Sequence, residues 1–306
     1  VTMEPKFKLT FFAPKYWMIW IFIGLWRLVI FLPFPILLAI GWCLGSILFL
    51  IPSSRKHVAK KNIEICFPDL TQKQKDSLLF KNFINVGLAV LETGIAWWWS
   101  SKRLSRIVHF EGLEHLDRQN GVLLLGIHYT TLEIGAASIL LRRQMDGMYR
   151  EHKNEVFNYI QLMGRRSKSN QCILYERRDV RSMMKALKNG RTVWYGPDQD
   201  YGLVQGMFVP FFGNEAATVT GTSRFARVSD AAVVPFSHIR LPRAKGYKVV
   251  IYPKLENFPS EDIKQDTIRV NAEIERLIMV KPDQYLWVHR RFKNRPEGEK
   301  DFYQSS

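Results

Sequence analysis

The amino-acid sequence predicts an α/β fold in which helices flank a mixed sheet, with an apolar helical segment at the N-terminus. Three observations support this prediction. Short apolar runs alternate with amphipathic stretches over residues 111–306, as strands and helices do in an α/β core. Residues 16–51 are almost entirely apolar and carry one charge, Arg27. The chain has 306 residues, of which 47% are hydrophobic, enough for a sizeable core.

The first element is the apolar run 16–51, which Pro33 and Pro35 divide into two segments. About 20 apolar residues are needed to span a bilayer. One interpretation is therefore a spanning helix near 16–34, followed by a membrane-associated segment. A hairpin or re-entrant dip is a second interpretation, and a pair of buried core helices is a third. A cleaved signal peptide is disfavoured, because the run is too long and lacks a small-residue cleavage site.

Basic residues directly after the apolar run indicate its orientation. The stretch SSRKHVAKK (53–61) carries four positive charges, from one arginine and three lysines. The positive-inside rule places such a stretch in the cytoplasm, and anionic lipid attracts it to the membrane surface. We therefore expect residues 1–52 to be a membrane anchor and residues 53–306 to lie on the cytoplasmic face. Within this second part, 53–110 is expected to be a helical lead-in and 111–306 the α/β core.

The lead-in is expected to contain one long helix after a break at Pro68. Thr71 and Gln74 have the spacing of a capping box, which marks a helix start. The residues that follow place apolar side chains on one stripe of a helix: Leu79, Phe83, Val86 and Val90. This helix runs toward ETGIAWWW (92–99), whose three tryptophans suit a membrane interface or a position under the core.

The core elements follow from apolar runs and helix signals. GVLLLGI (121–127) predicts a buried strand, and TLEIGAASILL (131–141) predicts a helix. A helix near 179–189 leads to a strand at 191–196. The last predicted elements are strands at 231–239 and 246–252 and a helix at 261–280, which opens with Glu261 and Asp262 at its positive end and stops at Pro282.

Charge and cysteine content restrict the function. Lysine and arginine number 44 against 28 acidic residues, a net charge of +16. Such an excess favours an anionic partner: nucleic acid, an anionic membrane surface or a phosphorylated substrate. The apolar run disfavours nucleic acid. The three cysteines Cys43, Cys66 and Cys172 form no CxxC, so neither a disulfide framework nor a zinc site is expected.

His128 and Glu133 lie where the first predicted core strand gives way to the next helix. On one continuous helix, residues five apart point about 140° apart and could not meet. They can meet if His128 ends the strand and Glu133 lies in the first helical turn, after an N-cap at Thr130 or Thr131. Glu133 would then accept a hydrogen bond from one ring nitrogen, leaving the other as a general base. A purely structural pairing at a helix start is the alternative.

The sequence contains no motif that supplies a protein nucleophile to such a base. Neither GxSxG, the elbow of α/β-hydrolases, nor HExxH, the zinc protease motif, occurs. A histidine base without a protein nucleophile should activate a hydroxyl group of the substrate itself.

The stretch GIHYTTLE (126–133) resembles the HxxxxD/E block of glycerolipid and lipid A acyltransferases. Over residues 11–300 the chain resembles the late acyltransferases of lipid A biosynthesis more closely. Glutamate at position 133 is similar to the lauroyl-type (HtrB-like) branch, whereas the myristoyl branch tends to have aspartate. The other stretches that carry the resemblance are PKYW (14–17), AKKNIEICFPD (59–69), ETGIAWWW (92–99), MYREHKN (148–154), WYGPDQDYG (194–202) and QYLWVHRRFKNRPEGE (284–299).

The resemblance implies a glycerolipid acyltransferase-like sandwich at the cytoplasmic face of a bacterial inner membrane. It implies transfer of an acyl chain from acyl carrier protein to a hydroxyl of Kdo2-lipid IVA, with anionic membrane lipid as a further partner and no cofactor. Direct transfer without a covalent acyl-enzyme is expected, because a donor thioester is already activated. Rival interpretations are a membrane-bound thioesterase or esterase, a lysophospholipid acyltransferase acting on a glycerophosphate, and a non-enzymatic module that binds anionic lipid.

The resemblance also implies roles for basic residues in two blocks. In MYREHKN, Arg150 is expected to bind acceptor phosphate, for which a planar guanidinium is suited, and Asn154 to contribute to the same substrate site. In GRRSKSN (164–170) one functionally important arginine is implied; Arg165 is favoured because it directly follows Gly164, and Arg166 stays open. Solvated basic loops are the alternative for both blocks.

Asp198 lies just beyond a predicted strand, where α/β sites form. The resemblance implies that it hydrogen-bonds acceptor hydroxyls; a plain turn is the alternative. Asp198 and Asp200 alone are a weak ligand set, so no metal is expected. The basic stretch HRRFKNR (289–295) is expected to hold lipid phosphates or the acidic carrier protein.

Overall fold

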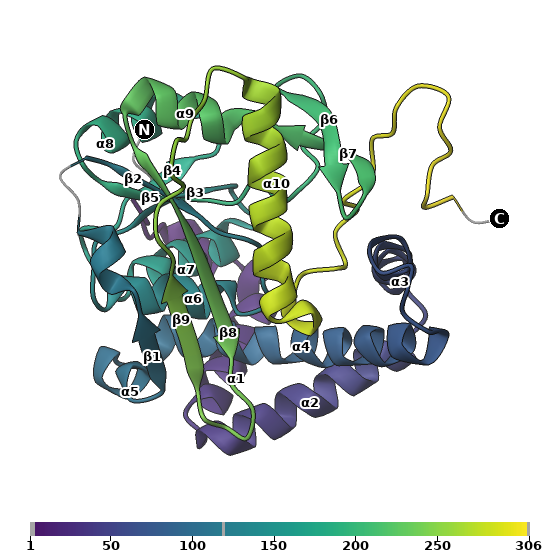
Figure 1. Cartoon of the computed structure of the whole chain (residues 1–306). Helices are drawn as coiled ribbons and strands as arrows, with labels where there is room; N and C mark the ends of the chain where they lie inside the picture. Colours follow the sequence, from purple (N-terminus) through teal and green to yellow (C-terminus); the bar gives the residue numbers. More distant parts are fainter. Residues whose placement is uncertain (1–3, 118–119, 305–306) are drawn as a thin grey trace.

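The computed structural model describes residues 4–117 and 120–304, and its centre is a seven-stranded sheet in the order β1–β9–β8–β2–β5–β3–β4 (Figure 1). β8 and β9 are antiparallel, and the other neighbouring strands of this sheet are parallel. The predicted mixed sheet is thus confirmed. Its strands are β1 (Val108–Glu111), β2 (Val122–Leu125), β3 (Asp146–Tyr149), β4 (Leu174–Glu176), β5 (Thr192–Tyr195), β8 (Ala232–Arg240) and β9 (Tyr247–Ile251).

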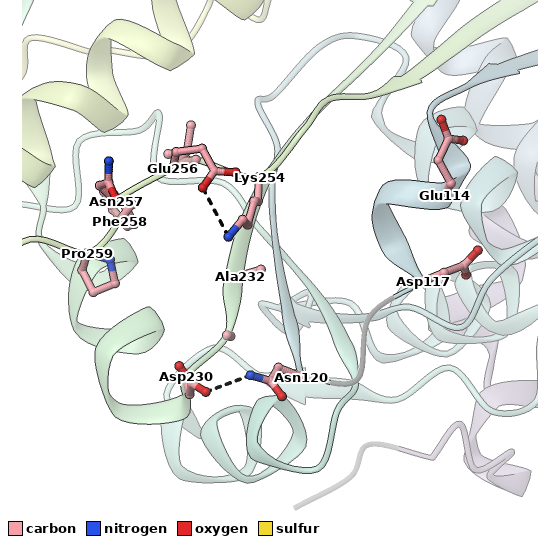
Figure 2. Close-up of a pocket in the computed structure, with 12 residues that line it drawn as sticks. Glu114, Asp117, Asn120, Asp230, Ala232, Lys254, Glu256, Asn257, Phe258 and Pro259 are labelled. Atoms are coloured by element: carbon pink, nitrogen blue, oxygen red, sulfur yellow. Dashed lines mark hydrogen bonds and ion pairs between the residues drawn. The ribbon is translucent and has the colours of Figure 1, made fainter.

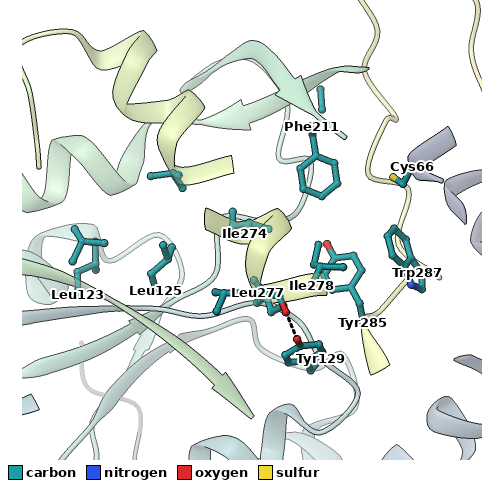
Figure 3. Packing of buried hydrophobic residues seen from close by; sticks show 14 of the residues in the cluster. Cys66, Leu123, Leu125, Tyr129, Phe211, Ile274, Leu277, Ile278, Tyr285 and Trp287 are labelled. Carbon is teal, nitrogen blue, oxygen red and sulfur yellow. Dashed lines mark hydrogen bonds between the residues drawn. The ribbon is translucent and has the colours of Figure 1, made fainter. Parts of the chain in front are cut away.

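The central strands are buried on both faces, which is why they read as continuous apolar runs. In β2, Leu123 and Leu125 point to one face, where they belong to the same apolar cluster as Ile274 and Leu277 (Figure 3). Val122 and Leu124 point to the other face and belong to a second cluster. The layer over the first face consists of α8 (Val180–Lys188), α9 (Gly221–Ser229), α10 (Ile263–Val280) and the hairpin β6 (Gly206–Phe211) and β7 (Asn214–Val219). The helix α3 (Ser54–Cys66) lies to the side and belongs to the same apolar cluster.

The second face is covered by α6 (Leu132–Leu140), on which α4 (Gln72–Trp98) packs. The predicted capping box is confirmed, because Thr71 and Gln74 bond each other's backbone N–H at the start of α4. The outer layer on this side consists of α1 (Trp17–Ile30), α2 (Phe34–Leu50) and α7 (Glu155–Arg166). The remaining short helices are α5 (Ser101–Ser105) and the 3₁₀ turns Leu9–Phe12, Pro14–Tyr16, Leu113–Leu116 and Pro282–Gln284.

The apolar N-terminal run forms two helices, α1 inside the predicted 16–34 segment and α2 after the break at Pro33. α1 has 14 residues and is about 21 Å long, short of the ~30 Å hydrocarbon core of a bilayer. α2 packs along α4 through Gly41, Gly45 and Gly87, and a Cβ on Gly87 would lie 2.2 Å from the backbone nitrogen of Gly45. Close backbone approach at small residues therefore fixes the apolar run to the body of the protein.

Two further features have the length and composition of a membrane span. α4 is long and apolar enough to cross a bilayer, but 61% of its most apolar window is buried inside the protein. α2 and α3 together are long enough, but they are bent by 91°. The burial of α4 and the bend between α2 and α3 are typical of helices that pack on the body of a protein.

Candidate active site

The geometry of the site begins with two adjacent parallel strands. β2 and β5 pair in register, with Leu125 beside Tyr195. His128 lies three residues beyond Leu125, and Asp198 lies three residues beyond Tyr195. The carboxyl ends of neighbouring parallel strands meet at one edge of a sheet, where α/β sites form. The register of these strands therefore brings His128 and Asp198 together.

The two side chains are directly hydrogen-bonded. Nδ1 of His128 is 2.6 Å from Oδ1 of Asp198, and the backbone N–H of His128 donates to Oδ2 at 2.9 Å. Burial raises the pKa of the Asp198 carboxyl, but the charge of His128 and its hydrogen bonds outweigh burial and lower that pKa below the usual range. An ionised carboxylate can only accept hydrogen bonds. In a neutral imidazole the proton would therefore sit on Nδ1 of His128, and Nε2 would carry the free lone pair.

The loop that carries His128 is fixed by the C-terminal part of the chain. The backbone carbonyl of His128 accepts from the N–H of Leu286 at 2.9 Å, and the N–H of Thr130 donates to the carbonyl of Gln284 at 2.8 Å. The hydroxyl of Tyr285 donates to the backbone carbonyl of Asp198 at 3.2 Å. One short segment thus holds both members of the pair.

Glycine and tryptophan shape the surroundings of the histidine. The rings of His128 and Trp194 meet edge to face, with centroids 5.4 Å apart. A Cβ on Gly196 would lie 2.7 Å from Cη2 of Trp194 and 3.0 Å from Cε1 of His128. The glycine after β5 is therefore required for these rings to pack. The His128 side chain stays 18% exposed, whereas that of Asp198 is fully buried.

The predicted hydrogen bond between His128 and Glu133 is wrong. Glu133 lies in the first turn of α6, as predicted, but its carboxylate bonds a different group. Nε and Nη2 of Arg165 donate to Oε1 of Glu133 at 2.9 and 2.6 Å, and the indole N–H of Trp97 donates to Oε2 at 2.9 Å. Asp198 occupies the ring nitrogen that was assigned to Glu133, because it follows a strand that neighbours β2.

The second charged pair, Glu133 with Arg165, is partly buried between three helices. The side chains are 15% and 23% exposed. Burial raises the pKa of Glu133, but the charge and hydrogen bonds of Arg165 and the hydrogen bond of Trp97 lower it by a larger amount. The pKa of Glu133 therefore lies below the usual range. Arg165 reaches Glu133 because Gly164 lets α7 lie directly on Trp97; a Cβ there would be 2.3 Å from the indole Cγ.

The structure also distinguishes the two arginines of GRRSKSN. Arg165 enters the site, whereas Nη2 of Arg166 donates to the backbone carbonyl of Asn170 at 3.4 Å, at the protein surface. The favoured choice, Arg165, is therefore the arginine nearer to the histidine motif.

The N-cap of α6 differs from the expectation in its chemistry. Thr131 occupies the N-cap position, but its hydroxyl makes no capping hydrogen bond. It donates to the backbone carbonyl of His238 at 2.7 Å and lies 2.9 Å from Nδ1 of the same residue. Burial lowers the pKa of His238 to about 3, so this histidine is neutral. Thr131 thus ties the start of α6 to β8.

Arg150 and Asn154 follow β3, on the other side of β5 from β2. Arg150 is exposed at the end of that strand. Asn154 is the N-cap of α7, where its side-chain oxygen accepts from the N–H of Phe157 at 3.0 Å. Arg150 is therefore free to face solvent, while Asn154 already positions the helix that carries Arg165.

One arginine of the C-terminal basic stretch is buried and has a structural role. Arg291 is 2% exposed and donates to the backbone carbonyl of Ala217 and to the hydroxyl of Thr218, both at 2.7 Å. Burial lowers the pKa of His289 to about 4. Arg291 therefore joins this stretch to the β6–β7 hairpin, and binding of lipid phosphate or carrier protein stays a prediction for the exposed Arg290 and Lys293.

A wide cavity of about 780 Å³ lies away from this site, beside the start of β8 (Figure 2). Two of its acidic residues have partners within the protein: Lys254 is 3.3 Å from Glu256, and Asn120 donates to Asp230 at 2.8 Å. The cavity lies at the end of the sheet where β2 and β8 begin, whereas His128 and Asp198 follow the ends of their strands. Its size therefore does not make it part of the His128 site.

Comparisons with known proteins agree over nearly the whole chain. A family model described as bacterial lipid A biosynthesis acyltransferase matches residues 4–294. The chain is 40% identical to the lipid A biosynthesis lauroyltransferase of Escherichia coli K12, covering 97% of this chain and 98% of the relative. It is 38% identical to the palmitoleoyltransferase of the same strain, with the same coverage, and 27% identical to its myristoyltransferase, covering 96% of this chain and 93% of the relative.

Among solved structures, the 1-acyl-sn-glycerophosphate acyltransferase of Thermotoga maritima is similar at a TM-score of 0.36 and 16% identity, covering 74% of this chain and 97% of that one. A likeness at this level carries no argument about the site.

Proposed function

The chain belongs to the bacterial lipid A biosynthesis acyltransferase family, and from that premise we propose that it transfers a fatty acyl chain, of the lauroyl type, from acyl carrier protein to a hydroxyl of Kdo2-lipid IVA. Family membership makes the protein an acyltransferase with a lipid A-type acceptor, so a non-enzymatic lipid-binding module is excluded. The acyl donor, the chain length and the catalytic residues are our proposal. The chain is similar to relatives named for lauroyl, palmitoleoyl and myristoyl transfer, so the relatives do not fix the chain length.

The observation that carries the mechanism is the His128–Asp198 hydrogen bond of 2.6 Å. Asp198 holds the proton on Nδ1 and thereby leaves Nε2 to act as general base. Asp198 thereby takes the positioning role, as the acid of a catalytic triad does. Asp198 is less suited to bind acceptor hydroxyls, because both of its carboxylate oxygens already accept hydrogen bonds from His128.

The reaction balances with these groups alone. Nε2 of His128 takes the proton of the acceptor hydroxyl as its oxygen attacks the thioester carbonyl carbon. The tetrahedral intermediate collapses, the carbon–sulfur bond breaks, and the imidazolium returns the proton to the leaving thiolate. The products are an ester on the acceptor and the free thiol of the carrier. Holding donor and acceptor together adds proximity to base catalysis.

Direct transfer without an acyl-enzyme is supported by the state of the cysteines. Burial raises the pKa of Cys172 to about 12 and raises that of Cys66 well above its usual value, so both thiols are protonated. Cys43 is exposed on α2, outside the site. The hydroxyl of Thr131 is bonded to the backbone carbonyl of His238. An acid-quenched mixture of enzyme and labelled donor should therefore contain no acylated protein.

Arg165 and Arg150 are proposed to bind acceptor phosphate. Arg165 donates to Glu133 through Nε and Nη2, and its remaining N–H groups are available to an anion. Glu133 accordingly assists by holding Arg165 in place, and not by orienting His128. Asn154 supports this site through the capping of α7, which carries Arg165.

Attachment to the inner membrane, with the catalytic part on the cytoplasmic face, is proposed from the apolar surface of α1 and α2. Both helices are apolar on their exposed sides as well as on their buried sides, so lipid is the solvent that suits them. Since α1 is short and α2 is fixed to α4, we favour immersion in one leaflet over a span. The exposed side chains are Trp17, Met18, Ile21, Phe22, Leu25, Leu28, Ile36, Ile40, Trp42, Ile47 and Leu50.

A native probe tests this attachment. Cys43 is exposed on α2, whereas Cys66 and Cys172 are buried. In sealed inner-membrane vesicles of either orientation, Cys43 should resist a bulky membrane-impermeant maleimide and react once detergent is added. Rapid labelling in intact vesicles would contradict immersion of this helix face.

The enzymatic proposal is tested by incubating the protein with lauroyl acyl carrier protein and Kdo2-lipid IVA and weighing the products. Acceptor that has gained one lauroyl group supports it. Free fatty acid without acylated acceptor would instead indicate a thioesterase. Acylation of a lysophosphatidic acid in preference to Kdo2-lipid IVA would indicate a glycerophosphate acyltransferase.

A further inference from the structure

The loop after β5 carries a second buried carboxylate, Asp200, which the proposed reaction does not use. Asp200 lies two residues beyond Asp198 and is 5% exposed. Its Oδ1 accepts from the backbone N–H of Gly202 at 2.9 Å and from Nδ2 of Asn294 at 2.6 Å, and its Oδ2 accepts from the backbone N–H of Asn294 at 2.8 Å. A buried carboxylate is costly unless it is hydrogen-bonded. These bonds therefore hold the loop after β5 against the C-terminal part of the chain.

The backbone of Asp200 is held by the same part of the chain. Its N–H donates to Nε2 of His289 at 3.3 Å. Because burial lowers the pKa of His289 to about 4, the ring is neutral near pH 7, and a backbone N–H can only donate. Nε2 of His289 therefore carries the lone pair. His289 and Asn294 both belong to HRRFKNR (289–295), so this stretch contributes neutral groups to the site beside its basic ones.

The same stretch also holds the loop that follows β2. The backbone N–H of His289 donates to the carbonyl of Leu286 at 3.3 Å, and the N–H of Leu286 donates to the carbonyl of His128 at 2.9 Å. Nδ2 of the buried Asn62, on α3, donates to the carbonyl of His289 at 2.6 Å. Residues 286–294 therefore bridge the loops after β2 and β5, and they are themselves fixed to α3.

Such a bridge matters because the His128–Asp198 bond joins two loops that are 70 residues apart in sequence. Its two atoms are 2.6 Å apart, so a small movement of the loop after β5 lengthens the bond or breaks it. A misplacement of about 1 Å by a change outside the reacting groups can cost about 10²-fold in rate. Asp200 itself offers little to a substrate, since both of its oxygens already accept hydrogen bonds within the protein. It is suited to hold the loop.

We propose that Asp200 is a positioning residue for acyl transfer. Through Asn294 and His289, it keeps Asp198 in hydrogen-bonding contact with the base. The inference rests on the proposed function, because that function makes His128 the general base. The two aspartates of this loop then have different tasks: the first orients the base, and the second orients the loop that carries the first.

The test uses two measurements on the full chain: steady-state transfer from lauroyl acyl carrier protein to Kdo2-lipid IVA, and the tautomer of His128 from nitrogen-15 NMR. Asp200→Asn keeps the shape of the side chain but turns an NH₂ group toward an N–H donor, whichever way the amide is rotated. It should lower kcat by about 10–10²-fold with little change in the acceptor KM. His128 should then populate both neutral tautomers.

His289 offers a pair of variants that separates positioning from packing. Glutamine reaches as far as Nε2 does and can accept from the N–H of Asp200, whereas asparagine is too short to do so. His289→Gln should therefore keep most of the wild-type kcat, and His289→Asn should lose kcat as Asp200→Asn does. A loss of packing alone would lower the melting temperature and leave the tautomer of His128 unchanged.

Asp266→Asn is the matched control. Asp266 is also a fully buried carboxylate, and it accepts from the N–H of Ser260 at 3.0 Å and from the hydroxyl of Ser223 at 2.6 Å. It lies in the first turn of α10, about 21 Å along the helix from Val280, the end that leads to the site. Asp266→Asn should lower the melting temperature, while kcat and the tautomer of His128 stay as in the wild type.

Loss of kcat and of the single tautomer in Asp200→Asn and His289→Asn, with both kept in His289→Gln and Asp266→Asn, supports the inference. A wild-type kcat and tautomer in Asp200→Asn, measured below its melting temperature, would overturn it, and so would an equal loss of kcat in Asp266→Asn. The NMR measurement needs no substrate. If the wild-type protein acylates no Kdo2-lipid IVA, the proposed function fails, while the tautomer comparison still decides whether Asp200 positions the pair.

Discussion

Two hydrogen-bonded pairs stand at the carboxyl end of the sheet, and they are built in different ways. His128 and Asp198 come from loops after two adjacent strands and are 70 residues apart. Glu133 and Arg165 come from two helices and are 32 residues apart. His128 and Glu133, five residues apart in one motif, belong to different pairs.

The difference between the pairs is one of function. The His128–Asp198 pair leaves a ring nitrogen with a free lone pair, which suits proton transfer. The Glu133–Arg165 pair leaves guanidinium N–H groups, which suit an anion. The two ends of the HxxxxE motif therefore contribute a base and a support for a cation, and substitutions should separate the two roles.

The largest effect is expected for His128→Ala. Loss of a general base costs about 10²–10⁴-fold in rate, and the surrounding glycines and Trp194 should keep the fold. Turnover of lauroyl acyl carrier protein with Kdo2-lipid IVA measures the effect, and vesicle binding serves as the control for membrane attachment. Wild-type turnover by the variant would contradict the mechanism.

Asp198→Asn is expected to lower kcat by about 10²–10³-fold. An amide has the shape of the carboxylate but does not select the Nδ1–H tautomer, and it cannot stabilise the imidazolium. The KM for acceptor should change little. If acceptor KM rose and kcat stayed near wild type, Asp198 would bind the acceptor as the family resemblance implied.

Glu133→Gln and Arg165→Ala are expected to raise the acceptor KM more than the donor KM, since lost ground-state binding has that signature. The two effects should be strongly non-additive, because the residues act as one pair. A double-mutant cycle on acceptor KM measures this coupling. Additive effects, or changes confined to donor kinetics, would assign the arginine to the carrier protein.

Arg150→Ala should raise the acceptor KM by a smaller factor, because Arg150 is exposed and its contacts are screened by solvent. The effect should weaken further as salt concentration rises. Steady-state kinetics at two ionic strengths measure it. A salt-independent loss of kcat would show that Arg150 takes part in the chemistry.

The pH dependence of stability should be the smallest effect. The pKa values of both Asp198 and Glu133 are lowered in the folded protein. Their stabilising contributions are present above the ordinary carboxyl pKa of about 4 and are lost as pH falls through the lowered values. The difference in melting temperature between wild type and Asp198→Asn should therefore shrink below about pH 4. A constant difference would contradict ionised carboxylates.

Much of the fold could be predicted, because its central strands are strongly apolar. The predicted strands correspond to β2, β5, β8 and β9, and the predicted helices to α4, α6, α8 and α10. β1, β3, β4 and the β6–β7 hairpin were missed. β3, with the sequence DGMY, and β4, with LYE, are too short to show periodicity, and neighbouring strands define them.

The site was harder to predict, because its pairing is non-local. Glu133 was assigned to His128 on closeness in sequence, whereas the partner is chosen by which strand lies beside β2. One signal was present: GIH and GPD follow two apolar strands with the same spacing. It identifies Asp198 only once β2 and β5 are known to be neighbours.

The central claim is that Asp198, and not Glu133, sets the tautomer of His128. Nitrogen-15 NMR of histidine-labelled protein measures this, with the His128 signal identified by its loss in His128→Gln. In the wild type and in Glu133→Gln, Nδ1 should carry the proton and Nε2 should not. In Asp198→Asn this preference should be lost. A tautomer change in Glu133→Gln, with none in Asp198→Asn, would contradict the account.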